Sequence, residues 1–175
     1  MTQITFTASP FPLARLIRWV TKGRVSHAML VYEDPQWGGR WVAEATVGGV
    51  KMLPAERALR HVVATYTCRF DTEPSLRMMR KHIGDGYDYA GLIFFGWAIL
   101  VWRLLHRKIR RPWRNTTEEF CSEFVALFLK DVVRRGIIVN RLPVDTTRTT
   151  PEQLLKALEM SPTFEKVTTD MTVLG

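Results

Sequence analysis

Apolar and polar residues alternate with the two-residue period of β-strands in several short segments near the start of the chain. Strands are predicted at 3–7, 26–33, 40–46, 50–53 and 61–70. The segment 26–33 is apolar on both faces, which is typical of a central strand. The connections at 34–39 and 48–49 contain glycine and are too short for crossovers, so the strands that they join should form an antiparallel meander.

Apolar residues at helical spacing predict helices between and after these strands. Helices are predicted at 13–20, 54–59, 74–83, 118–135 and from 150 onward. The first helix should pack one apolar face inward, with Arg15 and Arg18 facing away, and should end near Gly23. Its apolar residues are Leu13, Leu16, Ile17 and Val20.

The helix at 118–135 has the clearest pattern in the chain. One stripe of it contains Cys121, Val125, Phe128 and Val132. The last helix begins with Thr150 as N-cap and Pro151 at the first helical position.

Strands and helices are mixed along the chain, and all predicted strands lie before residue 71. This order predicts an α+β fold with one antiparallel sheet packed against helices. A length of 175 residues corresponds to about one domain, so 1–175 is expected to form a single domain with its own core. The hydrophobic content of 46% and charged content of 24% are typical of a globular chain and exclude a disordered one.

The composition gives no sign of a cofactor or of export. Two cysteines, Cys68 and Cys121, are too few for a disulfide scaffold or a four-ligand zinc site. The segment 1–10 lacks the basic and apolar pattern of a signal peptide. No apolar run reaches the roughly 18 residues of a membrane span. A location in the cytoplasm or in a virion is therefore expected.

The net charge of +8 favours anionic partners, and the basic residues are concentrated after an uncharged apolar run at 90–102. The run and its basic continuation, about 90–114, are expected to include a helix of the core. A helix lying on an anionic membrane, or docked on a partner such as a phage structural protein, stays open as an alternative. The side chains that would make such contacts are Arg103, Arg107, Arg110 and Arg111. Because no aromatic platform is interleaved with them, nucleic acid is not favoured.

Three residues together suggest nucleophilic chemistry. His27 starts one predicted strand and Glu44 lies near the end of the next, so the two side chains can share a face if the register agrees. Cys121 lies near the start of a helix, where the macrodipole favours a thiolate. An imidazole would take the thiol proton, and a carboxylate would orient the imidazole.

Each of these residues also has an ordinary structural interpretation. A cysteine on an apolar helical stripe is commonly a small core residue. A histidine at the edge of a strand is commonly structural, and a glutamate in a short strand commonly faces solvent.

The strings around these residues carry a resemblance. They are Ser-His-Ala-Met-Leu-Val at 26–31, Val-Ala-Glu-Ala at 42–45, Tyr-Asp-Tyr-Ala-Gly at 87–91 and Phe-Cys-Ser-Glu-Phe-Val at 120–125. In this order they resemble the circularly permuted branch of the NlpC-type papain-like cysteine hydrolases, in which the histidine strand precedes the cysteine helix. The resemblance extends over residues 9–135 and implies a papain-like fold.

The resemblance also implies roles for residues. Cys121 would be the nucleophile, His27 the general base and acid, and Glu44 the residue that orients the histidine. Tyr87 matches a tyrosine upstream of the cysteine helix and would help to hold the oxyanion together with the backbone N–H of Cys121; packing beneath the helix is its alternative role.

The helix start is ambiguous. Thr116 and Glu119 fit a capping box, which would place Cys121 in the second turn, where the dipole acts weakly. The resemblance places the cysteine in the first turn, with 115–119 as an ordered loop before the helix, and we adopt this placement.

The expected activity is that of a thiol peptidase or amidase. The resemblance implies peptides of the bacterial cell wall, the peptidoglycan, as substrates, in an enzyme of phage or other non-secreted origin. It also leaves open a lipid-directed acyltransferase or thioesterase, because lecithin–retinol acyltransferase-like members occur in the permuted branch. The remaining alternative is a non-catalytic module of a phage tail or assembly that retains the fold.

Overall fold

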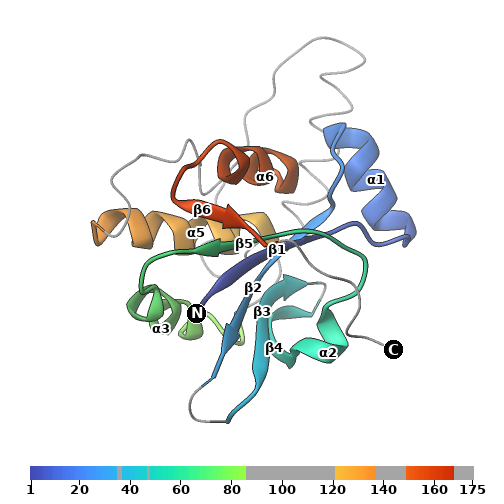
Figure 1. The fold of residues 1–175 in the computed structure, drawn as a ribbon. Coiled ribbons are helices and arrows are strands. Elements are labelled where there is room, and N and C mark those ends of the chain that lie inside the picture. Colours follow the sequence, from blue (N-terminus) through green and yellow to red (C-terminus); the bar gives the residue numbers. More distant parts are fainter. Residues whose placement is uncertain (35–36, 47, 86–120, 137–148, 168–175) are drawn as a thin grey trace, which may run out of the picture.

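The computed structural model describes residues 1–34, 37–46, 48–85, 121–136 and 149–167 (Figure 1). The strands are β1 (Gln3–Thr7), β2 (His27–Glu33), β3 (Arg40–Thr46), β4 (Gly49–Pro54), β5 (Val62–Cys68) and β6 (Phe164–Lys166). The helices are α1 (Pro12–Thr21), α2 (Ala55–Ala58), α3 (Glu73–Arg80), α5 (Cys121–Arg134) and α6 (Pro151–Glu159).

The strands form one antiparallel sheet in the order β4-β3-β2-β1-β5-β6. The predicted α+β class and the meander of β2, β3 and β4 are therefore confirmed. Strand β2 lies between β1 and β3, as its two apolar faces predicted. One end of the sheet collects the ends of β1 and β3 and the starts of β2, β4 and β5, and we call it the upper end of the sheet.

Strand β6 corrects the expectation that all strands lie before residue 71. It pairs with β5, with Cys68 opposite Phe164 and Tyr66 opposite Lys166, and forms one edge of the sheet. The strand has only three residues, so a two-residue period cannot be recognised in its sequence. Pairing with an existing strand stabilises this short segment, and that pairing is a tertiary contact.

The two faces of the sheet bury different sets of side chains. The larger core joins sheet residues such as Phe6 and Leu30 to Phe124 and Phe128 of α5 and to apolar residues of α6. On the opposite side of β2 and β3, a smaller cluster packs against α2; its members are Met29, Val31, Val42 and Ala55. The apolar stripe predicted for 118–135 is thus confirmed as the face that α5 buries against the sheet.

Helix α1 is formed as predicted, and Arg15 is exposed as predicted, but three other side chains of the helix are placed differently from the prediction. Leu13 and Leu16, expected to pack inward, are 42% and 53% exposed. Arg18, expected to face away, is partly buried, and its Nη1 donates to the carbonyl of Ser9 at 2.7 Å and to Ser26 Oγ at 3.3 Å. The guanidinium thus satisfies polar groups at both ends of the connection between β1 and β2. Because an unpaired buried polar group is costly in free energy, the pairing of Arg18 is favoured over burial of Leu13 and Leu16.

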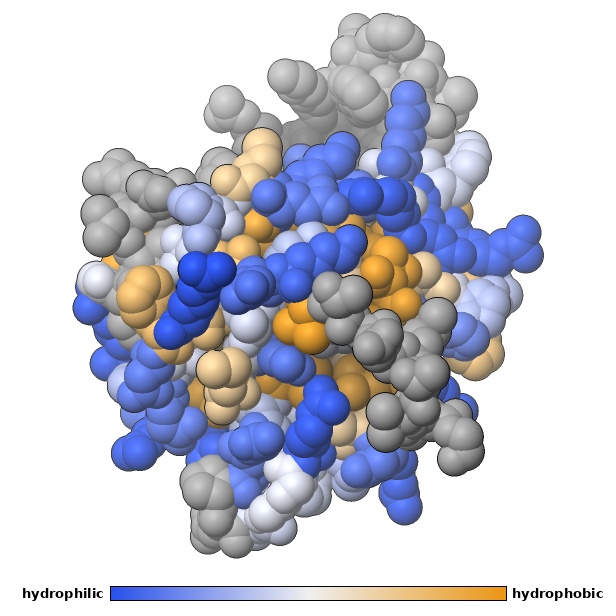
Figure 2. Space-filling model, in the orientation of Figure 1, coloured by the Kyte–Doolittle hydropathy of each residue, from blue (hydrophilic) through white to orange (hydrophobic). Residues whose placement is uncertain are grey.

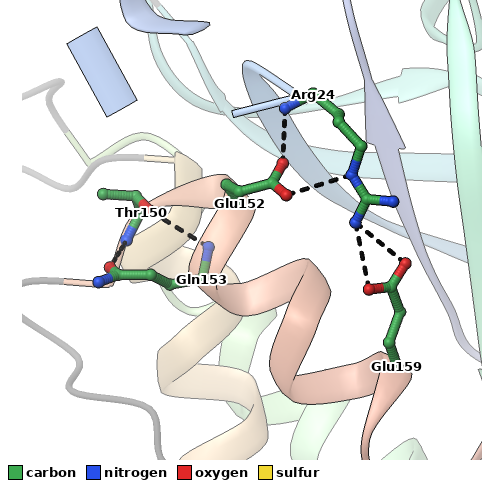
Figure 3. A network of polar contacts seen from close by, with 5 residues as sticks. All are labelled: Arg24, Thr150, Glu152, Gln153 and Glu159. Carbon is green, nitrogen blue, oxygen red and sulfur yellow. Dashed lines mark hydrogen bonds and ion pairs between the residues drawn. The ribbon is translucent and has the colours of Figure 1, made fainter. Parts of the chain in front are cut away.

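The turn after α1 is held by α6 (Figure 3). The backbone N–H of Arg24 donates to Glu152 Oε2 at 2.7 Å, and Arg24 Nε donates to Glu152 Oε1 at 3.2 Å. Arg24 Nη2 also pairs with Glu159 at 3.1 Å. A Cβ on Gly23 would lie 2.8 Å from the Cβ of Glu152, so only glycine allows this close approach. Thr150 and Gln153 form a capping box at the start of α6, which confirms the predicted N-cap.

Replacing Glu152 by Ala should destabilise the protein by about 2–3 kcal/mol, because a buried carboxylate that holds a backbone N–H and a guanidinium is lost. Urea unfolding followed by circular dichroism measures the change. Glu159→Ala is the matched control: this carboxylate is partly exposed, and its loss should cost less than about 1 kcal/mol. Equal effects of the two substitutions would contradict the importance assigned to the Glu152 contacts.

Hydrophilic side chains cover most of the face seen in Figure 2, and hydrophobic ones show between them. Among the described residues, no helix has the length and apolar character needed to cross a membrane. The predicted hydrophobic-basic segment at 90–114, with Arg103, Arg107, Arg110 and Arg111, lies outside the described residues.

Candidate active site

His27 is the first residue of β2, at the upper end of the sheet. It lies opposite Thr7, the last residue of β1, and directly follows the turn that α6 holds through Arg24. Its side chain is largely but not completely buried, with 20% of its surface exposed. The imidazole therefore lies at an edge of the core that substrate can approach.

Glu44 of β3 is bonded to this imidazole. In the β2–β3 register Leu30 faces Ala43, so the alternating positions on the other side of both strands carry His27 and Glu44 on the same face. Glu44 Oε2 lies 2.7 Å from His27 Nε2. Glu44 itself is buried, and its bond to His27 explains how a carboxylate is tolerated in an otherwise apolar strand.

Cys121, at the start of the described part of α5, completes the group. Helix α5 packs against β2 and β3 and brings the thiol into hydrogen-bonding contact with the His27 side chain. The backbone N–H groups of Ala28 and Ser122 also donate towards the sulfur. Since Glu44 occupies Nε2, Nδ1 is the ring nitrogen left to face the thiol. The side chains of Cys121, His27 and Glu44 therefore form one connected chain.

The electrostatics favour the ionised form of both Cys121 and His27. Burial opposes the thiolate, but the His27 charge, its hydrogen bond and the two backbone N–H groups outweigh burial and lower the pKa of Cys121. Burial likewise opposes the imidazolium, but Cys121 and then Glu44 outweigh it and raise the pKa of His27 to about 10. The site therefore favours a thiolate–imidazolium pair over a neutral thiol and imidazole.

Cys68 has the opposite environment. It ends β5 within the core, and burial raises the pKa of its thiol although a backbone hydrogen bond from Phe70 lowers it in part. A protonated, buried thiol of this kind is a packing residue. The two cysteines of the chain thus differ in the property that nucleophilic chemistry needs.

Tyr87, the fourth predicted site residue, lies outside the described residues. So do residues 116–119, on which the choice between the first and the second helical turn for Cys121 depends. The roles predicted for Tyr87 and for the helix dipole therefore stay predictions.

Sequence reasoning missed the two backbone donors to the sulfur, the N–H groups of Ala28 and Ser122. Every residue except proline has an N–H group, so residue type does not mark such a donor. Ser122 is next to Cys121 in the sequence, and the packing of α5 on β2 brings Ala28 near Cys121. In the described part of the chain, no group of three His, Cys, Asp or Glu side chains is arranged to hold a metal ion.

Comparison of the chain with models of known protein families and with curated proteins found no match in either.

Proposed function

We propose that this protein is a papain-like cysteine hydrolase that cleaves amide bonds through an acyl-enzyme. The observation that carries the proposal is the connected chain of Cys121, His27 and Glu44, in which the thiol pKa is lowered and the imidazole pKa is raised. A nucleophile, a base and an orienting carboxylate in contact are the groups that this chemistry requires. The sheet, the α5 helix packed on it and the order of the three residues agree with the permuted NlpC-type resemblance.

In the first half of the reaction, the Cys121 thiolate attacks the carbonyl carbon of the scissile amide. The carbonyl oxygen takes the negative charge, and nearby N–H groups stabilise it. As the C–N bond breaks, the His27 imidazolium donates its proton to the leaving amine. The products are a free amine, an acyl thioester on Cys121 and a neutral imidazole.

In the second half, His27 acts as a base. It removes a proton from a water molecule, whose oxygen attacks the thioester carbonyl. The C–S bond breaks, the carboxylic acid leaves, and the thiolate–imidazolium pair is restored. Glu44 keeps its bond to Nε2 throughout and so holds the ring in one orientation while the proton moves at Nδ1.

The burial of Cys121 and Glu44 supports a catalytic site over the alternative of a non-catalytic module that retains the fold. Both Cys121 and Glu44 are more than nine-tenths buried, and burying charged groups generally destabilises a fold. Apolar residues of similar volume would stabilise the same core more. A reaction that needs the charges explains why the chain retains them here.

Cell-wall peptides are the substrate class that the resemblance implies. The test is to incubate purified peptidoglycan with the protein and to identify released fragments by mass spectrometry. New amino and carboxyl ends should appear at a single type of peptide bond with the wild-type protein and should be absent with Cys121→Ala. Intact peptidoglycan after incubation with a protein whose Cys121 is reactive would reject this substrate while leaving the cysteine chemistry in place.

Lipid-directed acyl transfer is the second candidate, and one observation favours it. The exposed apolar residues of α1, Leu13 and Leu16, lie on the element that leads into the His27 strand. The same Cys121 thioester would then pass its acyl group to an acceptor amine or alcohol in place of water. Incubation with phospholipid vesicles and an amine acceptor, followed by mass spectrometry of the lipids, distinguishes this reaction from peptide hydrolysis.

A further inference from the structure

Helix α1 presents an apolar surface to solvent at the upper end of the sheet. Phe11, Leu13, Leu16 and Trp19 are all substantially exposed, and all of them except Leu13 are more than half exposed. On a helix, positions 13, 16 and 19 follow one another along a single side, so these side chains form one stripe. We call the four residues the α1 surface.

A second element extends the exposed apolar area at this end of the sheet. Val62 and Val63 at the start of β5 are exposed. Thr7 pairs with Val62, and the backbone N–H of Ala8 donates to the carbonyl of His61 at 3.0 Å, so the start of β5 adjoins the segment that leads into α1. Two elements distant in sequence therefore expose apolar side chains at the same end of the sheet.

The charged residues of α1 and of its C-terminal end are all positive. The first 32 residues of the chain contain no Asp or Glu, and α1 has no acidic residue in its first turn. Arg15 and Lys22 are exposed on α1 and at its C-terminal end. The nearby acids of α6, Glu152 and Glu159, are paired with Arg24. The α1 surface is thus apolar in its middle and cationic at its margins.

We propose that the α1 surface docks the protein on an anionic lipid bilayer, with the helix lying in the plane of the headgroups. An amphipathic helix with Trp, Phe and Leu on one side and basic residues beside them is the form that binds such interfaces. The apolar side chains enter the acyl boundary, and Arg15 and Lys22 meet the lipid phosphates. An anionic lipid surface complements the positive charge at the margins of the α1 surface, whereas a neutral protein groove would not complement it.

This docking places the candidate active site close to the bilayer. Arg18 of α1 is bonded to Ser26, the residue before His27, so the helix and the catalytic histidine are directly connected. Substrates held at or next to a membrane would therefore meet the site after docking. The inference does not depend on which bond the site cleaves, since binding can be measured without turnover.

The test is sedimentation with vesicles of phosphatidylglycerol and phosphatidylcholine, using wild type and the inactive Cys121→Ala. Both proteins should bind, and binding should weaken with added salt and be lost on vesicles of phosphatidylcholine alone. Leu13→Ser combined with Leu16→Ser should weaken binding about tenfold. Arg15→Gln combined with Lys22→Asn should weaken it about thirtyfold at low salt, from roughly 1 kcal/mol for each cation near the surface; asparagine tolerates the left-handed backbone of Lys22.

Phe70→Ser is the matched control. Phe70 is exposed to the same extent as Leu16 but lies just after the end of β5, at the opposite end of the sheet, so its replacement should leave binding unchanged. Melting temperatures check that every variant is folded. Absence of binding by wild type, or equal binding by the α1 variants and by Phe70→Ser, would overturn the proposal. A wild-type dimer that the two serines dissociate would overturn it too, because a second copy would then occupy the α1 surface.

Discussion

Cys121 should react with iodoacetamide at pH 6.5 at least about a hundredfold faster than Cys68. The His27 charge and hydrogen bond lower the pKa of Cys121, whereas burial raises the pKa of Cys68. At that pH a thiol with a pKa above 9 is less than about 1% thiolate, and the thiolate is the reactive form. Mass spectrometry of the two cysteine peptides over time gives both rates in the same sample.

The pH dependence of Cys121 alkylation provides a second test, because the direction of its shift can be predicted. Because the pKa of Cys121 is lowered, its alkylation should persist to lower pH than that of an ordinary thiol and decline only as pH falls through that lowered value. In His27→Ala the charge and hydrogen bond that stabilise the thiolate are removed, and the decline should move to higher pH. An unchanged profile in His27→Ala would show that His27 does not activate the cysteine. Equal rates for Cys121 and Cys68 in the folded protein would reject Cys121 as the nucleophile.

His27→Ala should reduce acyl-enzyme turnover on the order of 10³- to 10⁴-fold, because the base that activates both the thiol and the water is lost. Glu44→Gln should reduce it less, about 10- to 100-fold, since the Cys121–His27 pair remains while the carboxylate that orients the ring is gone. p-Nitrophenyl acetate serves as the acyl donor. Release of p-nitrophenolate gives the turnover, and intact-protein mass spectrometry detects the acetylated cysteine.

Two controls make the comparison informative. Circular dichroism confirms that each variant is folded, which matters because both side chains are largely buried. Glu159→Ala, a change to a partly exposed acidic residue of α6 that pairs with Arg24, should leave turnover unchanged. Full turnover in Glu44→Gln would mean that another group orients His27. Full turnover in His27→Ala would remove the basis of the proposed function.

The apolar pattern by itself determined most of the elements and their class. The alternation at 26–33 and 40–46 and the stripe at 118–135 are repeated often enough to identify strands and a helix without knowledge of their neighbours. Short connections with glycine imposed the antiparallel meander. From the sequence, His27 and Glu44 could share a face only if the register of the two strands agreed.

Only the tertiary structure decided the features that depend on distant parts of the chain. The 2.7 Å contact between His27 and Glu44 needs a particular register of two strands, and the approach of Cys121 needs α5 to pack on β2. A single-sequence pattern records which residues are apolar, and it does not record which pairs meet. The ionisation of Cys121 and His27 depends on these contacts, so the sequence alone could only suggest it as a hypothesis.

Helix α1 is another element whose side-chain placement the sequence pattern could not predict. Its period of apolar residues correctly predicted a helix but not the exposure of Leu13 and Leu16, and Arg18 turns inward to bond Ser9 and Ser26. Strand β6 exists because β5 offers it unpaired backbone groups at the edge of the sheet. Local periodicity therefore determines the elements, whereas the satisfaction of polar groups between elements determines which side chains are left at the surface and which meet at the site.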